Sequence, residues 1–349
     1  MKDNESRAKF VRAGLMPPEV PTFGNGYSSG LGLWLFEQPT AYYRRHLFLH
    51  EGTHGFMNTV LGGAGPPWYM EGIAELFATH SYQNGRLQMS YFPARREEVP
   101  MLGRIKMIET STTQRGVMPL EAILNYDHRA HLQNEAYAWC WALAKFLDTH
   151  PRYQARYRSL NDHVRDPDFT ERFTKLFARD RPLLTEEWQL FAATLRHGHD
   201  IEQTVIDWKP GRTLAAGEAR TAVLAARGWQ NSGLKLVAGV TYHIAAEGRF
   251  QLADKPKIWW SEPGGVTIRY HDGRPLGMLL GAVWPDSRRA AGNRRGEPAV
   301  KTPLLSPFEV GTGTTHTPAV SGTLYLKIND SPGELDDNKG SVEVRVSAS

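Results

Sequence analysis

The chain has 349 residues, of which 41% are apolar, which is enough for two domains with separate cores and too long for one compact core. Its net charge of +4 comes from 41 basic against 37 acidic residues spread along the chain, and this even spread gives no indication of a concentrated nucleic-acid-binding surface. The densest basic run, RRAAGNRR at 288–295, lies among Gly and Ala and is typical of a solvated loop, with a polyanion site as the open alternative.

The sequence also bears on location and redox chemistry. No apolar run approaches the roughly 20 residues that span a bilayer, and the first ten residues lack the apolar core of a signal peptide. We therefore expect no membrane span, with a secreted or periplasmic protein if the chain begins after a removed leader and a cytoplasmic one otherwise. The single cysteine, Cys140, lies in the apolar run YAWCWALAKFL, which predicts a buried thiol and excludes an internal disulfide.

The predicted elements divide into a helical half and a β half. A strand is predicted over 30–36 (GLGLWLF), either in the core or at an edge where an extended peptide could pair with its main chain. Apolar residues then recur at helical spacing from about 40 to 200, and short alternating runs separated by Gly, Pro and Asp follow. The expected fold is multidomain α+β, with a mainly helical domain over 1–206 followed by an all-β domain over 207–349 that forms a β-sandwich.

The stretch HLFLHEGTHGFMN, residues 46–58, holds the pattern H-E-x-x-H. On a helix His50 and His54 project from one face about one turn apart, a separation that lets two imidazoles share one tetrahedral ion, and Glu51 falls beside them. Because the chain has 13 histidines, coincidence stays open. A catalytic zinc takes three protein ligands and an open position, so a third ligand is expected downstream.

The segment PPWYMEGIAELFATH, residues 66–80, supplies candidates for that ligand. It opens with two prolines and places Glu71 and Glu75 four residues apart on one face of a second helix, where a solvated charged face is the alternative. Together the two stretches resemble the gluzincin metallopeptidases, in which H-E-x-x-H is followed by a glutamate ligand on a second helix. WYMEGIAELF is similar to the W-x-x-E-G-x-A-E pattern of bacterial peptidase-MA-like domains.

The resemblance implies a set of roles for these residues. His50, His54 and Glu71 would be the zinc ligands. Glu51 would be the general base, and Glu75 an outer acceptor that orients a ligand imidazole. Zinc polarises a carbonyl and acidifies water, so the expected reaction is hydrolysis of a peptide bond.

The resemblance also points to a donor for the tetrahedral oxyanion. This is Tyr137 in NEAYAWCWALAKFL, because related domains carry a similar Y-x-x-x-W helix downstream. Tyr137 is equally compatible with a packed aromatic, and Tyr126, His128 and His131 are rival donors.

Near the C-terminus, GTLYLKINDSPGELDDNKGSVEVRV at 322–346 gathers Asp330, Glu334, Asp337 and Asn338 in one turn-rich loop. Clustered oxygen ligands suit calcium, although the spacing is not that of an EF-hand. The stretch resembles the bacterial galactophilic lectins, whose N-D-x-P-G-x-x-x-N-N-x-G loop holds a calcium ion that a sugar then coordinates. By that resemblance the four residues are candidate calcium ligands, and an ordinary hairpin turn is the alternative.

The two resemblances therefore imply a zinc metallopeptidase with a lectin-like domain. Binding of calcium and glycan by that domain stays open, because a lectin-like fold without its ligands is the alternative. Its partner would be a peptide or protein, glycosylated if the second domain carries the enzyme to its substrate. The alternative, of a different class, is a carbohydrate-binding protein built on a peptidase scaffold that is no longer active.

Overall fold

The computed structural model describes residues 3–22, 24–29, 32–129, 133–214, 217–286 and 302–349. These residues form helices and several β-sheets, which confirms the α+β class. The chain divides into two compact units, unit 1 at Met1–Ala178 and unit 2 at Arg179–Ser349. The basic run at 288–295 lies outside the described residues, as does His131. None of the described helices is both long and apolar enough to cross a bilayer.

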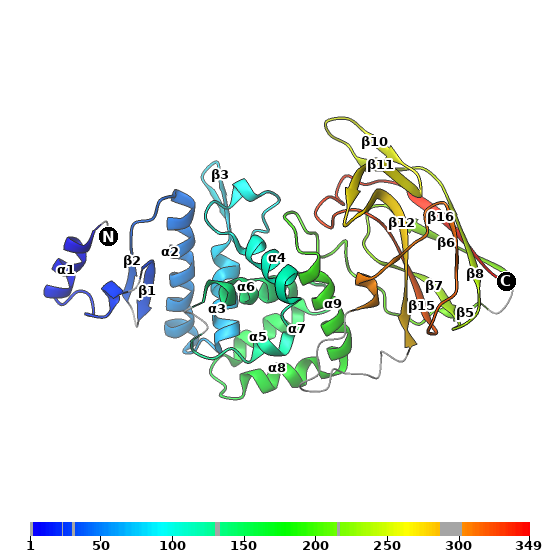
Figure 1. Cartoon of the computed structure of the whole chain (residues 1–349). Coiled ribbons are helices and arrows are strands. Elements are labelled where there is room, and N and C mark those ends of the chain that lie inside the picture. Colours follow the sequence, from blue (N-terminus) through cyan, green and yellow to red (C-terminus); the bar gives the residue numbers. More distant parts are fainter. Residues whose placement is uncertain (1–2, 23, 30–31, 130–132, 215–216, 287–301) are drawn as a thin grey trace. The chain divides into compact units, whose positions relative to one another are not determined.

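Unit 1 is mainly helical (Figure 1). Its helices are α1 (Asn4–Arg12), α2 (Ala41–Phe56), α3 (Pro67–Ala78), α4 (Arg104–Arg115), α5 (Leu120–Leu124), α6 (Asn134–Thr149), α7 (Gln154–Ser159) and α8 (Phe169–Phe177). Two short antiparallel pairs accompany them, β1 (Gly26–Ser29) with β2 (Gly32–Leu35) and β3 (Ser81–Gln83) with β4 (Arg86–Gln88).

Helix α2 carries the H-E-x-x-H stretch. It begins after Thr40, whose side-chain oxygen accepts a hydrogen bond from the Tyr43 amide at 3.1 Å. It continues past its last residue as a π-helical turn, η2 (Met57–Leu61). Three histidines of α2, His46, His50 and His54, are buried. Imidazoles therefore occupy a face where apolar side chains normally pack, and they need polar partners from a neighbouring element.

Helix α3 supplies those partners while it packs closely on α6. A Cβ atom at Gly72 would stand 3.0 Å from the carbonyl oxygen of Cys140 and 3.1 Å from the Cβ of Ala144. Any side chain at position 72 would push the two helices apart, so glycine permits the close approach. Cys140 is a buried free thiol, as predicted.

Unit 2 contains α9 (Arg181–Ala193) and most of the described strands. One sheet has the order β11-β12-β15-β7-β5, with β13 paired to β12, and the other has the order β14-β8-β16-β6. Side chains of both sheets, such as Leu236, Leu324, Ile244 and Val344, share one buried cluster, so the sheets pack face to face. The strands are β5 (Arg212–Thr213), β6 (Glu218–Leu224), β7 (Gln230–Leu236), β8 (Tyr242–Glu247), β9 (Phe250–Ala253), β10 (Trp259–Ser261), β11 (Gly264–His271), β12 (Arg274–Pro285), β13 (Phe308–Glu309), β14 (Gly313–His316), β15 (Gly322–Ile328) and β16 (Ser341–Ala348).

The division between the units differs from the expected domain boundary at 206/207. Helix α9, which the sequence placed with the helical half, belongs to unit 2. Its Leu190 packs in a buried cluster with Trp208, Trp284 and Tyr325. Helical periodicity predicted the helix itself, but it carries no information about which core a helix joins.

Candidate metal centre

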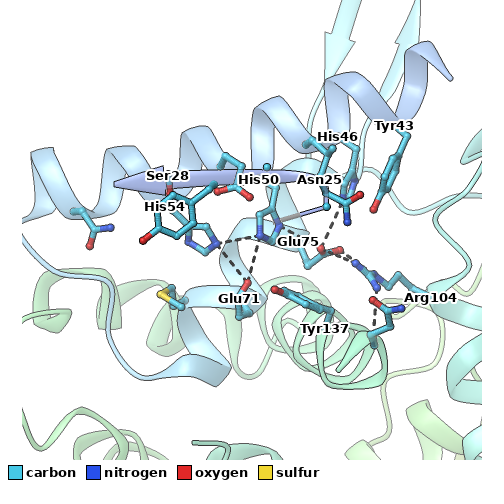
Figure 2. Close-up of a pocket in the computed structure, with 18 residues that line it drawn as sticks. Asn25, Ser28, Tyr43, His46, His50, His54, Glu71, Glu75, Arg104 and Tyr137 are labelled. Atoms are coloured by element: carbon cyan, nitrogen blue, oxygen red, sulfur yellow. Dashed lines mark hydrogen bonds and ion pairs between the residues drawn. The ribbon is translucent and has the colours of Figure 1, made fainter. Parts of the chain in front are cut away.

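A cavity of about 580 Å³ lies in unit 1. Residues of α2, α3, α4, α6 and β1 line it, together with neighbouring loop residues (Figure 2). It brings together every site residue that the sequence predicted for the first domain: His50, Glu51, His54, Glu71, Glu75 and Tyr137.

Three ligand atoms converge inside this cavity. The Nε2 atoms of His50 and His54 are 3.0 Å apart, and each lies 3.4 Å from Oε2 of Glu71 (Figure 2). A tetrahedral ion with bonds of about 2.0–2.1 Å holds its ligand atoms about 3.3–3.4 Å apart. The triangle therefore has nearly the size of one face of a zinc tetrahedron, and all three side chains are buried.

Some buried polar atoms of these three side chains lack ordinary partners. Among the described residues, neither Oε2 of Glu71 nor Nδ1 of His54 has a hydrogen-bond partner. Burial opposes a charge on His50, yet the close carboxylates of Glu71 and Glu75 raise its pKa to about 10. Burial would raise the pKa of Glu71, but the two imidazoles lower it to about 2. The cluster thus requires a positive charge between these side chains, and the donor set fits a zinc ion in place of the proton.

Glu75 contacts the opposite side of the His50 ring. Its Oε1 lies 3.2 Å from Nδ1 of His50 and 3.5 Å from Nε2 of His46. Arg104 donates to both carboxylate oxygens, from Nη2 at 2.7 Å and from Nε at 3.0 Å. Burial would raise the pKa of Glu75, but the charge of Arg104 holds it well below its ordinary value. A carboxylate at Nδ1 favours the tautomer of His50 that carries its proton on Nδ1. The lone pair on Nε2 then faces the ligand triangle.

Glu51 lines the cavity beside strand β1. A Cβ atom at Gly26 would stand 3.0 Å from Cγ and 3.2 Å from Oε1 of Glu51, so the glycine lets the strand pass close to the carboxylate. The strand predicted over 30–36 corresponds to β2, with residues 30 and 31 outside the described part. Its partner β1, which lines the cavity, was not predicted, because GYSS contains little of the β-branched and aromatic signal.

Tyr137 lies beside the ligand triangle, with its ring centroid 5.8 Å from that of His50. Burial first, and then the charges of three nearby glutamates, raise the pKa of Tyr137, so its hydroxyl stays protonated and able to donate. Of the described rivals, Tyr126 and His128 are not among the residues that line the cavity.

Several cavity residues were missed in the sequence. His46 had a detectable signal, because His46, His50 and His54 recur every four residues on one helix. Arg104 had none, since it reaches Glu75 from another helix and 29 residues away in the chain. The other missed polar residues are Asn25, Tyr27, Ser28, Tyr43, Asn58 and Asn134.

The predicted calcium ligands of unit 2 are distributed among different partners. Oδ2 of Asp330 accepts a hydrogen bond from Nδ2 of Asn338 at 2.9 Å, and burial raises the pKa of Asp330 to about 7. Asp337 accepts from a backbone amide at 3.0 Å, and Glu334 pairs with an arginine at 3.2 Å. Among the described His, Cys, Asp and Glu residues, this loop contains no group of three with ligand atoms within 4.8 Å of one another.

No protein-family model matches the chain, and no curated protein sequence matches it. Among solved structures it is similar to the N-terminal, PllA-like lectin domain of EclA, with a TM-score of 0.26 and 21% identity, over 37% of this chain and 95% of that one. It is also similar to PliG, a periplasmic inhibitor of g-type lysozyme from Aeromonas hydrophila, with a TM-score of 0.21 and 11% identity, over 42% of this chain and 96% of that one.

A further similar structure is IMPa from Pseudomonas aeruginosa in complex with an O-glycopeptide, with a TM-score of 0.22 and 11% identity. The match covers 78% of this chain and 26% of IMPa, so this chain spans about a quarter of that protein. A second structure of IMPa, described as a metallopeptidase, contains T-antigen and has a TM-score of 0.20 with 12% identity, over 87% of this chain and 27% of that one. Similarity at such TM-scores carries no argument about activity.

Proposed function

We propose that this protein is a zinc-dependent metallopeptidase of the gluzincin kind. The observation that carries the proposal is the triangle of Nε2 of His50, Nε2 of His54 and Oε2 of Glu71. Its edges are close to those of a tetrahedral zinc site, and Oε2 of Glu71 is buried without a hydrogen-bond partner among the described residues. A zinc ion held there would supply Lewis acidity towards a carbonyl and towards water.

The protein's own residues supply the remaining chemistry. Glu51 accepts a proton from the attacking water and passes it to the leaving nitrogen as the carbon–nitrogen bond breaks. Tyr137 keeps its proton and donates a hydrogen bond to the oxyanion that forms. Glu75 orients the His50 ring through Nδ1 and does not contact the substrate.

Strand β1 offers a place for the substrate. It pairs with β2 at one edge, and no other described strand pairs with its second edge. An extended peptide that added to β1 would run beside Glu51, since Gly26 lies against that side chain. We include glycosylated peptides among the proposed substrates, and an O-glycopeptide is one to test beside its unglycosylated form.

The test combines metal analysis with one conservative variant. Purified protein is expected to hold one zinc ion per chain, and Glu51→Gln should keep that zinc but lose most peptide cleavage, because the amide cannot accept the proton. Absence of zinc, or cleavage unchanged in Glu51→Gln, would overturn the proposal. If cleavage is absent from the wild type while glycans bind, the carbohydrate-binding alternative is favoured.

We also propose that unit 2 binds calcium at Asp330 and Asn338. Oδ1 of Asn338 is buried without a described partner, and Asp330 is a buried acid next to it. A calcium ion would neutralise the carboxylate and take that amide oxygen as a ligand. Calorimetric titration with calcium should show binding to the wild type and none to Asp330→Asn, and equal binding by both would contradict this site.

A further inference from the structure

The cavity holds a second group of possible metal ligands that overlaps the first. One ligand atom each of His46, His50 and Glu75 lies within 4.8 Å of the other two, and all three side chains are buried. Oε1 of Glu75 is 3.5 Å from Nε2 of His46 and 3.2 Å from Nδ1 of His50. The two groups share the His50 ring, whose Nε2 faces Glu71 and whose Nδ1 faces Glu75. By the types of their side chains and by their burial, both groups could bind a metal ion.

The hydrogen bond of His46 shows that this second group is suited to a cation. Nδ1 of His46 lies 3.1 Å from the carbonyl oxygen of Ala78. A carbonyl only accepts hydrogen bonds, so Nδ1 carries the proton and Nε2 of the neutral ring presents a lone pair. That lone pair faces Oε1 of Glu75 at 3.5 Å, an arrangement of two acceptors that requires a positive charge nearby.

Arg104 is the cation that meets this requirement. Its guanidinium group binds Glu75 through two hydrogen bonds, of 2.7 and 3.0 Å, and both side chains are buried. Such paired bonds have a fixed geometry and neutralise the carboxylate without a metal. A further bond from Nη1 to the carbonyl oxygen of Asn134, at 3.3 Å, ties the guanidinium to the start of α6.

We propose that Arg104 is a positioning residue that restricts this centre to a single metal ion. Because Arg104 binds both carboxylate oxygens of Glu75, the second group cannot bind a metal ion. Glu75 then contacts Nδ1 of His50 and orients its ring. Without Arg104, a metal ion could bind His46 and Glu75 and take Nδ1 of His50 as a third ligand, with the remaining ring proton released to solvent. This inference rests on the proposed zinc centre of His50, His54 and Glu71.

The experiment compares three variants of the full chain with the wild type. Arg104→Gln removes the charge and the two-pronged contact, and the double variant Arg104→Gln with Glu75→Gln also removes the anion. Arg115→Gln is the matched control, because Arg115 also lies on α4 and pairs with Glu135 of α6 at 2.6 Å, outside the cavity. Each protein is checked by circular dichroism, equilibrated with excess zinc or cobalt, separated from free metal and measured for bound metal and for cobalt absorption.

Relative to the wild type, Arg104→Gln should bind one additional equivalent of metal and show a second cobalt absorption phase. The double variant and Arg115→Gln should bind the same number as the wild type. Saturation of Arg104→Gln at the wild-type stoichiometry overturns the inference. If Arg104→Gln does not fold, the wild type still provides a test, because uptake of a second cobalt ion in this centre contradicts the restriction by Arg104. Absence of metal from the wild type would instead refute the proposed function.

Discussion

The cavity of unit 1 and the loop at 322–346 of unit 2 both contain possible metal ligands, but among the described residues only those of the cavity bring three ligand atoms close together. In the cavity, ligand atoms of His50, His54 and Glu71 come within 3.4 Å of one another. In the loop, Asp337 and Glu334 bond to other parts of unit 2, and only Asp330 and Asn338 contact each other.

The difference follows from the elements that carry the side chains. Residues on α2 and α3 are held by helical backbones whose amides are already hydrogen-bonded, so backbone groups cannot turn towards the carboxylate of Glu71. A loop has free amides and can fold around its acids, as the amide of Ser331 does for Asp330 at 2.7 Å. Acidic residues on packed helices are therefore stronger indicators of a metal than the same residues on a loop.

The largest expected effect comes from breaking the triangle in the cavity. Glu71→Gln keeps the shape of the side chain but removes its charge, so zinc affinity should fall by at least about 100-fold, since even outer partners of metal ligands cost about 10–100-fold. Metal content after dialysis and peptide cleavage measure this loss. Glu334→Gln, in the loop, is the control and should retain zinc. Stoichiometric zinc in Glu71→Gln would show that the triangle is not the metal site.

A smaller effect is expected from Tyr137→Phe, which tests whether the cavity also acts on the oxyanion. Loss of one such donor lowers kcat by about 100–1000-fold, and zinc content should not change because Tyr137 is not in the ligand triangle. Steady-state kinetics beside metal analysis separates the two effects. Tyr126→Phe, outside the cavity lining, should leave kcat unchanged. If Tyr137→Phe also leaves kcat unchanged, Tyr137 is a packing residue.

The smallest effect on catalysis is expected in the loop, where Asp330 should control stability rather than activity. Its pKa is raised from 3.8 to about 7 by burial, so the folded state binds the proton more tightly than the unfolded state. Stability from this group is present below its ordinary pKa and is lost as the pH rises towards about 7, by roughly 2–4 kcal/mol.

Calorimetric unfolding in the presence of a calcium chelator measures this loss. The wild type should lose stability over that pH range relative to Asp330→Asn, whose amide does not titrate. Added calcium should reduce the loss, since the ion binds the ionised carboxylate. Parallel pH profiles of the two proteins would show that burial does not raise the pKa of Asp330.

Local patterns in the sequence were sufficient to predict the helices and strands in which similar residues recur at a regular short spacing. The four-residue spacing of His50 and His54, and of Glu71 and Glu75, predicted two helices with paired polar faces, and both helices are present as α2 and α3. Alternating runs likewise predicted strands in the second half. These features depend on backbone periodicity, which neighbouring residues determine.

Only the tertiary structure decided how those faces are used. It directs Glu71 to two imidazoles and Glu75 to Arg104, although the two glutamates are equivalent in the local pattern. It also places β1 beside Glu51 and assigns α9 to the core of unit 2. Each of these outcomes depends on contacts between residues far apart in the chain. Side-chain volume and charge balance select the partner in such contacts, and helical spacing carries no information about which partner a residue meets.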